Sequence, residues 1–117
     1  MAPWRRAKKI KDTTIHNAVF AKDINALKHL LTRKSVNVNA VNAKGATALH
    51  VAVVLEDLDA LRALLAHPDI DPNAQEPNGK TALHLAVSAG SPSAIEALLE
   101  HPRTNVNLAD RAGRSPL

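Results

Sequence analysis

Three histidines recur at a fixed interval, because His16, His50 and His84 lie 34 residues apart along the chain. Histidine is a frequent metal ligand and a frequent general base, so a regular row of histidines first suggests a metal site. A shared zinc ion would require each ligand nitrogen to lie about 2 Å from the metal. Side chains from successive layers of packed helices are instead about 10 Å apart. The interval therefore favours a structural role for each ring, and we predict no metal ion.

No arrangement of residues typical of catalysis is present in the sequence. The chain contains no cysteine and no tyrosine, and none of its serines lies in a G-x-S-x-G motif. Asp57 with Asp59, and Asp69 with Asp71, have a spacing that is more typical of turns and helix caps than of an acid–base pair. The phosphate-binding motifs G-x-G-x-x-G and Walker A are absent. We therefore expect no enzyme, no cofactor and no small-molecule substrate.

Length and composition favour one small helical domain. The chain has 117 residues, the size of a single domain. Hydrophobic residues make up 45% of it and aromatic residues only 2%, so alanine and leucine must form the core, which favours closely packed small helices. No apolar run approaches the roughly 18 residues that a membrane span requires, and the start lacks the apolar stretch of a secretory signal. Because the absence of cysteine also fits a reducing compartment, we expect a cytoplasmic or nuclear protein.

The sequence repeats itself every 34 residues. The segment Gly45–His50 (GATALH) recurs as Gly79–His84 (GKTALH), residues 113–117 begin it again, and residues 11–16 are a degenerate copy. Repetition at such a period is typical of stacked-repeat proteins. The period divides the chain into a basic leader, three repeats and the start of a fourth, at residues 1–10, 11–44, 45–78, 79–112 and 113–117.

Each repeat predicts two short helices. A threonine precedes an alanine-rich apolar run, and its hydroxyl suits the N-cap of a first helix. The candidate caps are Thr13, Thr47 and Thr81. After a polar break, leucines at helical spacing predict a second helix over residues 24–31, 58–65 and 94–99. Helices of this length are not stable alone, so they must stack on neighbouring pairs.

These segments resemble the ankyrin-repeat signature G-x-T-P-L-H-x-A-A. The matching residues are Gly45–Val53 (GATALHVAV) and Gly79–Val87 (GKTALHLAV), and Glu56 stands where the family has the glycine that ends the first helix. The resemblance covers residues 11–117 and implies an all-α solenoid of helix-turn-helix pairs joined by β-turn or hairpin loops. It also implies that the histidines bond the turns, with the threonine caps as partners.

The two ends of the array differ. The first repeat carries polar Asn17 and charged Lys28, as expected of an N-terminal capping repeat with a wetter outer face. The fourth repeat begins without a comparable cap, and terminal repeats usually need one. We therefore expect the array to continue in a longer protein.

The resemblance implies a non-catalytic protein-interaction module within a larger scaffold, adaptor or effector protein. The family occurs in eukaryotic cytosolic and nuclear proteins, and in effectors that intracellular bacteria deliver into host cells. Its members hold partner proteins with their hairpin tips and with the concave face of the first helices. The matching tip residues are Val41, Lys44, Ala46, Gln75, Asn78, Lys80, Arg111 and Arg114, and the matching helix residues are Phe20, Val54, Leu55 and Ser88.

Three of these helix residues are apolar where a solvated groove would carry polar side chains: Phe20, Val54 and Leu55. Two interpretations remain open. The side chains form an exposed apolar patch, which usually marks an interface. Alternatively, they turn inward and seal the helices together.

The net charge of +4 has its origin in the first eleven residues, since the remaining ten Lys and Arg face eleven Asp and Glu. In one interpretation this basic start is a solvated or partly helical leader that covers the first repeat. In the other, it makes the protein a nucleic-acid-binding or nuclear adaptor. The basic residues are Arg5, Arg6, Lys8, Lys9 and Lys11.

Overall fold

The structure is a computed structural model in which residues 14–117 are described. The basic start and the candidate cap Thr13 lie outside the described residues. Within residues 14–117 the chain forms helices and no β-strand, which confirms the predicted all-α class. The helices are α2 (Thr14–Phe20), α3 (Ile24–Leu31), α4 (Ala48–Val54), α5 (Leu58–Leu65), α6 (Ala82–Ala89) and α7 (Pro92–Glu100).

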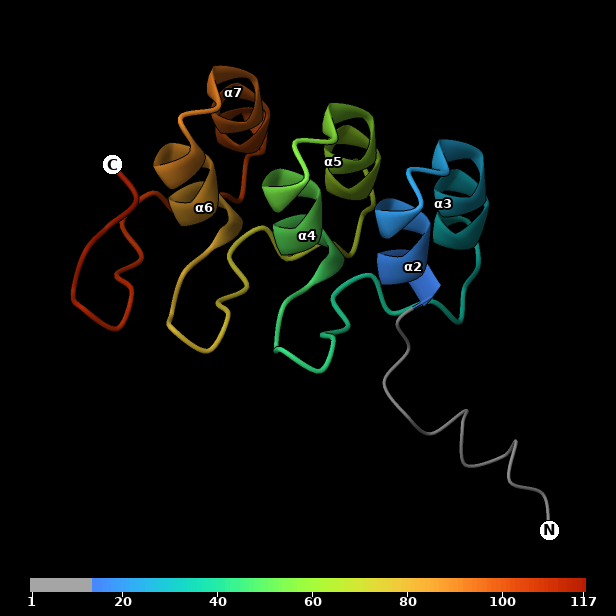
Figure 1. Cartoon of the computed structure of the whole chain (residues 1–117), viewed down its shortest axis with the longest axis horizontal. Helices are drawn as coiled ribbons and strands as arrows, with labels where there is room; N and C mark the ends of the chain where they lie inside the picture. Colours follow the sequence, from blue (N-terminus) through green and yellow to red (C-terminus); the bar gives the residue numbers. More distant parts are fainter. Residues whose placement is uncertain (1–13) are drawn as a thin grey trace, which may run out of the picture.

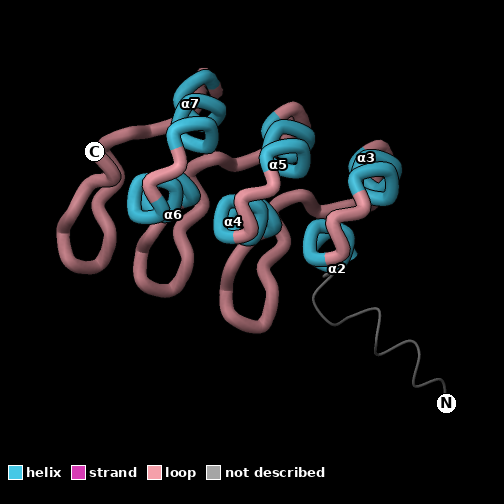
Figure 2. The backbone as a smooth tube through the Cα atoms, turned by 45° about the horizontal axis from the view of Figure 1, so that its top comes forward, coloured by secondary structure: helices cyan, strands magenta, loops and turns pink. Residues whose placement is uncertain are grey.

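The helices stack as three pairs, α2 with α3, α4 with α5, and α6 with α7 (Figure 1). Helices α2, α4 and α6 lie side by side and form an inner row, while α3, α5 and α7 form an outer row. The loops that follow each pair extend from the inner row away from the outer row, as Figure 2 shows. We call their outermost segments, residues 41–46, 75–80 and 109–114, the hairpin tips.

The inner helices begin where the threonines predict. The hydroxyl oxygen of Thr47 accepts from the backbone N–H of His50 at 3.4 Å, and that of Thr81 accepts from the N–H of His84 at 3.3 Å. Each histidine ring returns the bond, because its Nδ1 accepts from the backbone N–H of the threonine. These reciprocal bonds satisfy amides that would otherwise lack partners at the start of the helix.

The outer helices are capped by Asp23, Asp57 and Ser91. Helices α3 and α5 have the predicted bounds, but α7 begins at Pro92, two residues before the predicted start. Ser91 accepts from the N–H of Ala94, and proline suits the first turn of a helix because its missing N–H would have no partner there.

The turn between the two helices of each pair requires a left-handed backbone. Lys22 and Glu56 have φ of +56°, and Gly90, at the equivalent position, has φ of +65°. For residues with a Cβ this conformation costs roughly 1–2 kcal/mol, which glycine avoids. The first two repeats therefore carry backbone strain at a turn where the third repeat has none.

The core is built from residues that recur at the repeat period. Ala18, Ala52 and Ala86 are buried in the inner row, where their small size lets neighbouring helices approach closely. Val53 is buried, whereas Val87 at the equivalent position is 36% exposed, because a further helix pair covers only the first of them. Burial therefore depends on stacking, as the short helices predict. None of the helices described is long and apolar enough to cross a membrane.

Candidate functional site

Each histidine of the row joins its own repeat to the next repeat by a hydrogen bond. The Nε2 of His50 donates to the carbonyl oxygen of Lys80 at 3.0 Å, and that of His84 donates to Arg114 at 2.9 Å. Their Nδ1 atoms accept from the threonine caps, so both nitrogens of each ring are engaged. His16 bonds the carbonyl of Ala46 at 2.9 Å in the same way. The rings therefore join each inner helix to the next hairpin.

The Nδ1 of His16 has no partner within residues 14–117. At the equivalent place, the ring of His50 bonds Thr47, and the residue in that position of the first repeat is Thr13, which lies outside the described residues. Burial lowers the pKa of His50, while the Lys80 carbonyl raises it in part. The neutral ring, with its proton on Nε2, is the form that fits these bonds.

The hairpin tips are held rigid by one polar side chain each, at equivalent positions. The side chain of Asn42 accepts from the N–H of Lys44 at 2.9 Å, Glu76 accepts from Lys80 at 2.9 Å, and Asp110 accepts from Arg114 at 2.9 Å. The hydrogen bond from the backbone N–H of Arg114 lowers the pKa of Asp110, whereas desolvation raises it. The hydrogen bond has the larger effect, so the pKa of Asp110 lies below its ordinary value. The tip backbones are thus ordered before any partner arrives.

Neighbouring tips also pack tightly. Gly79 has φ of +80°, and a Cβ there would lie 2.8 Å from the backbone nitrogen of Arg111 in the next tip. That nitrogen donates to the carbonyl of Asn78 at 2.9 Å. Gly79 is therefore required both by its backbone conformation and by the close approach of the next hairpin.

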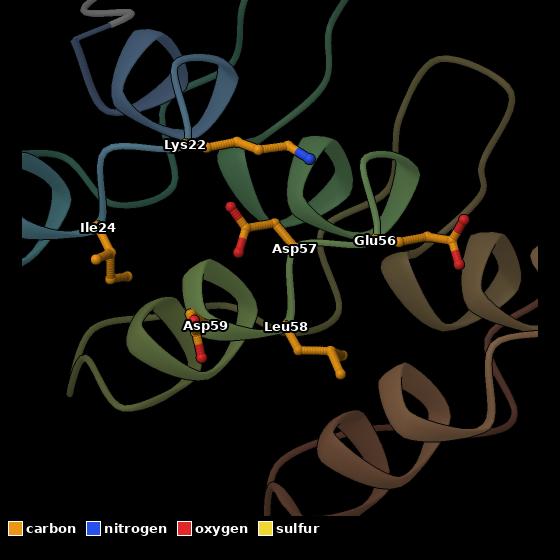
Figure 3. Close-up of a pocket in the computed structure, with 6 residues that line it drawn as sticks. All are labelled: Lys22, Ile24, Glu56, Asp57, Leu58 and Asp59. Atoms are coloured by element: carbon orange, nitrogen blue, oxygen red, sulfur yellow. The ribbon is translucent and has the colours of Figure 1, made fainter.

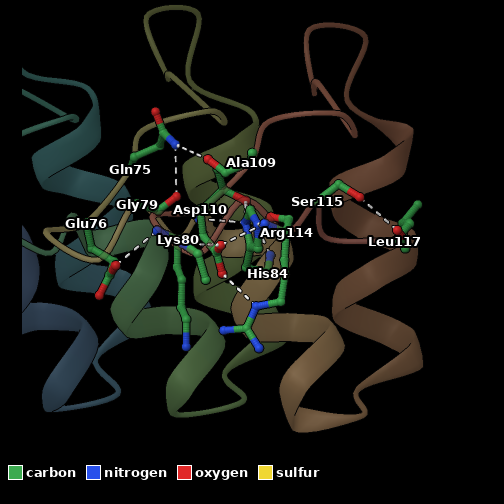
Figure 4. Close-up of polar contacts among 12 residues, drawn as sticks. Gln75, Glu76, Gly79, Lys80, His84, Ala109, Asp110, Arg114, Ser115 and Leu117 are labelled. Atoms are coloured by element: carbon green, nitrogen blue, oxygen red, sulfur yellow. Dashed lines mark hydrogen bonds and ion pairs between the residues drawn. The ribbon is translucent and has the colours of Figure 1, made fainter.

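The predicted tip residues differ in how available they are to a partner. Val41, Lys44, Asn78, Arg111 and Arg114 are exposed, whereas Ala46 and Lys80 are half-buried. The exposed Gln75 is committed to structure, because its side-chain amide donates to the carbonyls of Gly79 and Ala109, at 2.9 and 3.1 Å (Figure 4). Gln75 therefore serves to tie two tips together.

The apolar residues of the inner row divide into two groups. Phe20 and Val54 are 57% and 64% exposed, so they do not turn inward. Leu55 is half-buried and packs against the core, so it follows the second of the two interpretations. Ser88, which continues the line of Phe20 and Val54 onto α6, is exposed. An apolar pair therefore faces solvent on neighbouring inner helices.

A shallow hollow lies just past the C-terminal ends of α2 and α4, lined by residues of two successive turns (Figure 3). Its acidic residues include Asp57, whose carboxylate is committed to the N-cap of α5 by a 3.1 Å bond from Ala60. Ile24 and Leu58 contribute apolar side chains that also pack against the core. Asp57, Ile24 and Leu58 thus have structural roles, and the residues that line the hollow include no nucleophile with an adjacent base.

Two kinds of residue outside the predicted site join one repeat to the next. Asn39 donates to the carbonyl of Asp69 and accepts from the N–H of Asp71, both at 2.8 Å, and Asn73 makes the equivalent pair of bonds. Arg103 reaches back to the preceding repeat. The recurrence of asparagine at the repeat period was the available signal, but its partners are backbone atoms, which leave no mark in the sequence.

Comparison with known proteins agrees with this geometry. Residues 49–99 match a family described as ankyrin repeats present in many copies. Residues 49–99 are ankyrin repeats. The crystal structure of EF0377, an ankyrin repeat protein, is similar with a TM-score of 0.81 and 24% sequence identity, over 90% of this chain and 52% of that one. The chain therefore spans about half the length of EF0377, and no curated protein matches its sequence.

Ankyrin repeats are generally non-catalytic modules that bind other proteins. The structural roles found here for the histidines are consistent with that description. For this chain, the features to be explained are therefore the exposed side chains of the inner row and of the hairpin tips.

Proposed function

We propose that the chain binds a partner protein through the hairpin tips and the solvent-facing side of the inner row, as the recognition part of a larger scaffold, adaptor or effector protein. The observation that carries this proposal is the exposed pair Phe20 and Val54, on neighbouring helices and in the same register. Exposed apolar area is unfavourable in water, and its burial against a partner supplies binding free energy.

The rigidity of the tips supports the same proposal. Each tip is closed by backbone bonds, as between Asn42 and Ala46 at 2.9 Å, and by a side chain that accepts from the turn. A surface that is already ordered loses little conformational entropy when it binds. The cross-repeat bonds from His50 and His84 fix the tips relative to the helices that carry the apolar pair.

The test is affinity capture from cell lysate with three forms of the chain. The wild type is compared with Phe20→Ser/Val54→Ser, which removes the apolar pair and leaves the half-buried Leu55 in place. The matched control is Leu99→Ser, which changes an exposed apolar residue of the outer row. We expect a protein that the wild type and the control retain and that the double variant loses.

Equal retention by all three forms would contradict the proposal. Equal unfolding midpoints for the three forms are required as well, because Phe20 and Val54 are largely exposed and their replacement should change stability by no more than about 0.5 kcal/mol. A fourth form without residues 1–10 tests the alternative function. Capture that depends on those residues, and is released by salt, would assign binding to the basic start instead.

A further inference from the structure

We propose that the partner segment recognised by this surface is acidic and carries apolar side chains. In this arrangement its carboxylates face the hairpin tips while its apolar side chains contact Phe20 and Val54. The inference rests on the proposed function, since it names the chemistry of the partner for the same surface.

The charged residues of the tips are unequally presented to solvent. The cations are Lys44, Lys80, Arg111 and Arg114, and the anions are Glu76 and Asp110. Both carboxylates are turned into their own hairpins, where they accept from backbone N–H groups. The side chain of Asp110 is only 4% exposed. A partner that approaches the tips therefore meets ammonium and guanidinium groups.

Two of these cations are aligned by the repeat itself. Lys80 and Arg114 occupy equivalent positions in successive hairpins, and Figure 4 shows their side chains extending in the same direction. Within residues 14–117, the tips contain a single ion pair, in which the Nε of Arg114 lies 3.5 Å from the Oδ2 of Asp110. The ammonium group of Lys80 and the terminal guanidinium nitrogens of Arg114 form no ion pair within these residues, so they are available to a partner.

The helices of the inner row carry no charge that would repel such a segment, and charged residues near the apolar pair are confined to the turns that follow it, which hold Lys22 and the acidic Asp23, Glu56 and Asp57. Helices α2, α4 and α6 contain neither acidic nor Lys or Arg side chains, and their histidines are buried. The surface therefore combines a cationic edge at the tips with helices that are uncharged and partly apolar. Complementary potentials of this kind accelerate association and select among partners.

This combination favours a polypeptide over a nucleic acid. Proteins that bind single strands place several aromatic side chains under successive bases, and this chain has one Phe and one Trp, with no Tyr. Nucleic acid would use the cationic edge but would leave Val54 in water. An acidic segment with leucine, isoleucine or phenylalanine uses both parts of the surface.

The experiment is selection of twelve-residue peptides from a random displayed library on the full chain, without bias toward any composition. We expect the selected peptides to shift to negative net charge relative to the input library and to carry at least one large apolar residue. One selected peptide is then measured by fluorescence anisotropy against Lys44→Gln/Lys80→Gln. We expect about a tenfold loss of affinity at low salt, and a smaller loss as salt screens the charges.

The matched control is Lys28→Gln/Lys34→Gln, which makes the same change in net charge with exposed residues outside the tips and the inner row. Equal losses from the two variants would overturn the inference, because binding would then follow net charge alone. Selected peptides that are neutral or basic, yet lose binding with Phe20→Ser/Val54→Ser, would overturn the inference and leave the proposed function standing.

Two further outcomes separate the remaining cases. If no peptide is selected, or if the selected peptides bind the Phe20→Ser/Val54→Ser variant as well as the wild type, the proposed function fails together with the inference. If a single-stranded twelve-nucleotide DNA displaces the peptide and loses affinity with Lys44→Gln/Lys80→Gln, the surface is a nucleic-acid site, which also overturns the inference.

Discussion

At the junction between the first and second repeats, His16 donates to Ala46, and the side chain of Asn39 bonds the backbone of Asp69 and Asp71. At the junction between the second and third repeats, His50 and Asn73 make the equivalent bonds. The two junctions thus share one framework, in which a ring and an amide of one repeat hold the backbone of the next.

The second junction has further bonds that the first lacks among the described residues. Arg103 donates to the carbonyls of Pro68 and Ile70, at 3.1 and 2.9 Å, and Gln75 donates to Ala109. In the first junction the equivalent positions hold Asp69 and Val41, whose side chains cannot donate such bonds. Since repeat arrays are stabilised by the coupling between neighbours, the first repeat should separate from the array before the others.

The largest effect is expected from the shared framework. His50→Ala removes the ring that joins Thr47 to Lys80, leaves backbone groups unpaired and opens a cavity, so the free energy of unfolding should fall by about 2–3 kcal/mol. His16→Ala should mainly release the first repeat, with a smaller loss and a lower denaturant slope. Urea unfolding followed by circular dichroism measures both. Equal losses with unchanged slopes would show that the two junctions are equally strong.

The next effect isolates the additional bonds. Arg103→Ala removes two charge-assisted bonds from the second junction and should lower the free energy of unfolding by about 1.5 kcal/mol. Asp69→Ala is the matched change in the first junction and should stay within about 0.5 kcal/mol of the wild type. Urea unfolding of the two variants gives the comparison, and a larger loss from Asp69→Ala would reverse the order of the junctions.

The first repeat can also be strengthened from within. Lys22→Gly relieves a left-handed residue, and we expect a gain in stability of about 1 kcal/mol that delays separation of the first repeat. Gly90→Ala is the opposite change and should lower stability. No atom lies within 4 Å of the added Cβ, so this variant changes only the backbone strain. Hydrogen exchange of the amides of α2 and α3 reports the result. Unchanged protection in Lys22→Gly would mean that the turn does not limit the first repeat.

The smallest effect comes from moving the arginine bonds to the first junction. Asp69→Arg places a guanidinium where Arg103 lies in the next repeat, within reach of the carbonyls equivalent to those of Pro68 and Ile70, and should stabilise by about 0.5 kcal/mol. Asp69→Lys makes the same charge change without the planar fork and should gain less. A thermal-melting midpoint that rises equally for both would assign the gain to charge and contradict the bonding explanation.

The repeat period determined most of what the sequence could predict. Thr47 and Thr81 were identified as caps because a hydroxyl before an apolar run has few other roles, and the structure confirms them. The leucine spacing predicts that the last helix starts at residue 94, whereas α7 starts at Pro92. The spacing of apolar residues contains no information on Ser91 and Pro92, which together define the helix start. Caps outside the apolar pattern were therefore the weakest part of the fold prediction.

The surface was less predictable than the fold. Val54 and Leu55 are adjacent and chemically alike, yet one faces solvent and the other packs against the core. Their difference depends on the rotation of α4 against its neighbours, which no local pattern specifies. Likewise, Gln75 was predicted to contact a partner, but its amide bonds the carbonyls of two hairpins, and backbone acceptors are available next to any residue type.

The hydrogen bonds from the histidine row affect how the number of repeats in such a chain can change during evolution. Each ring bonds a carbonyl 30 residues further along the chain, which is less than one repeat. The pairs are His16 with Ala46, His50 with Lys80, and His84 with Arg114. The acceptor is a backbone carbonyl, which every residue supplies. If recombination removes or duplicates 34 residues, every histidine meets an equivalent carbonyl in its new neighbour. The histidine bonds themselves therefore need no compensating substitution when the array lengthens or shortens by whole units.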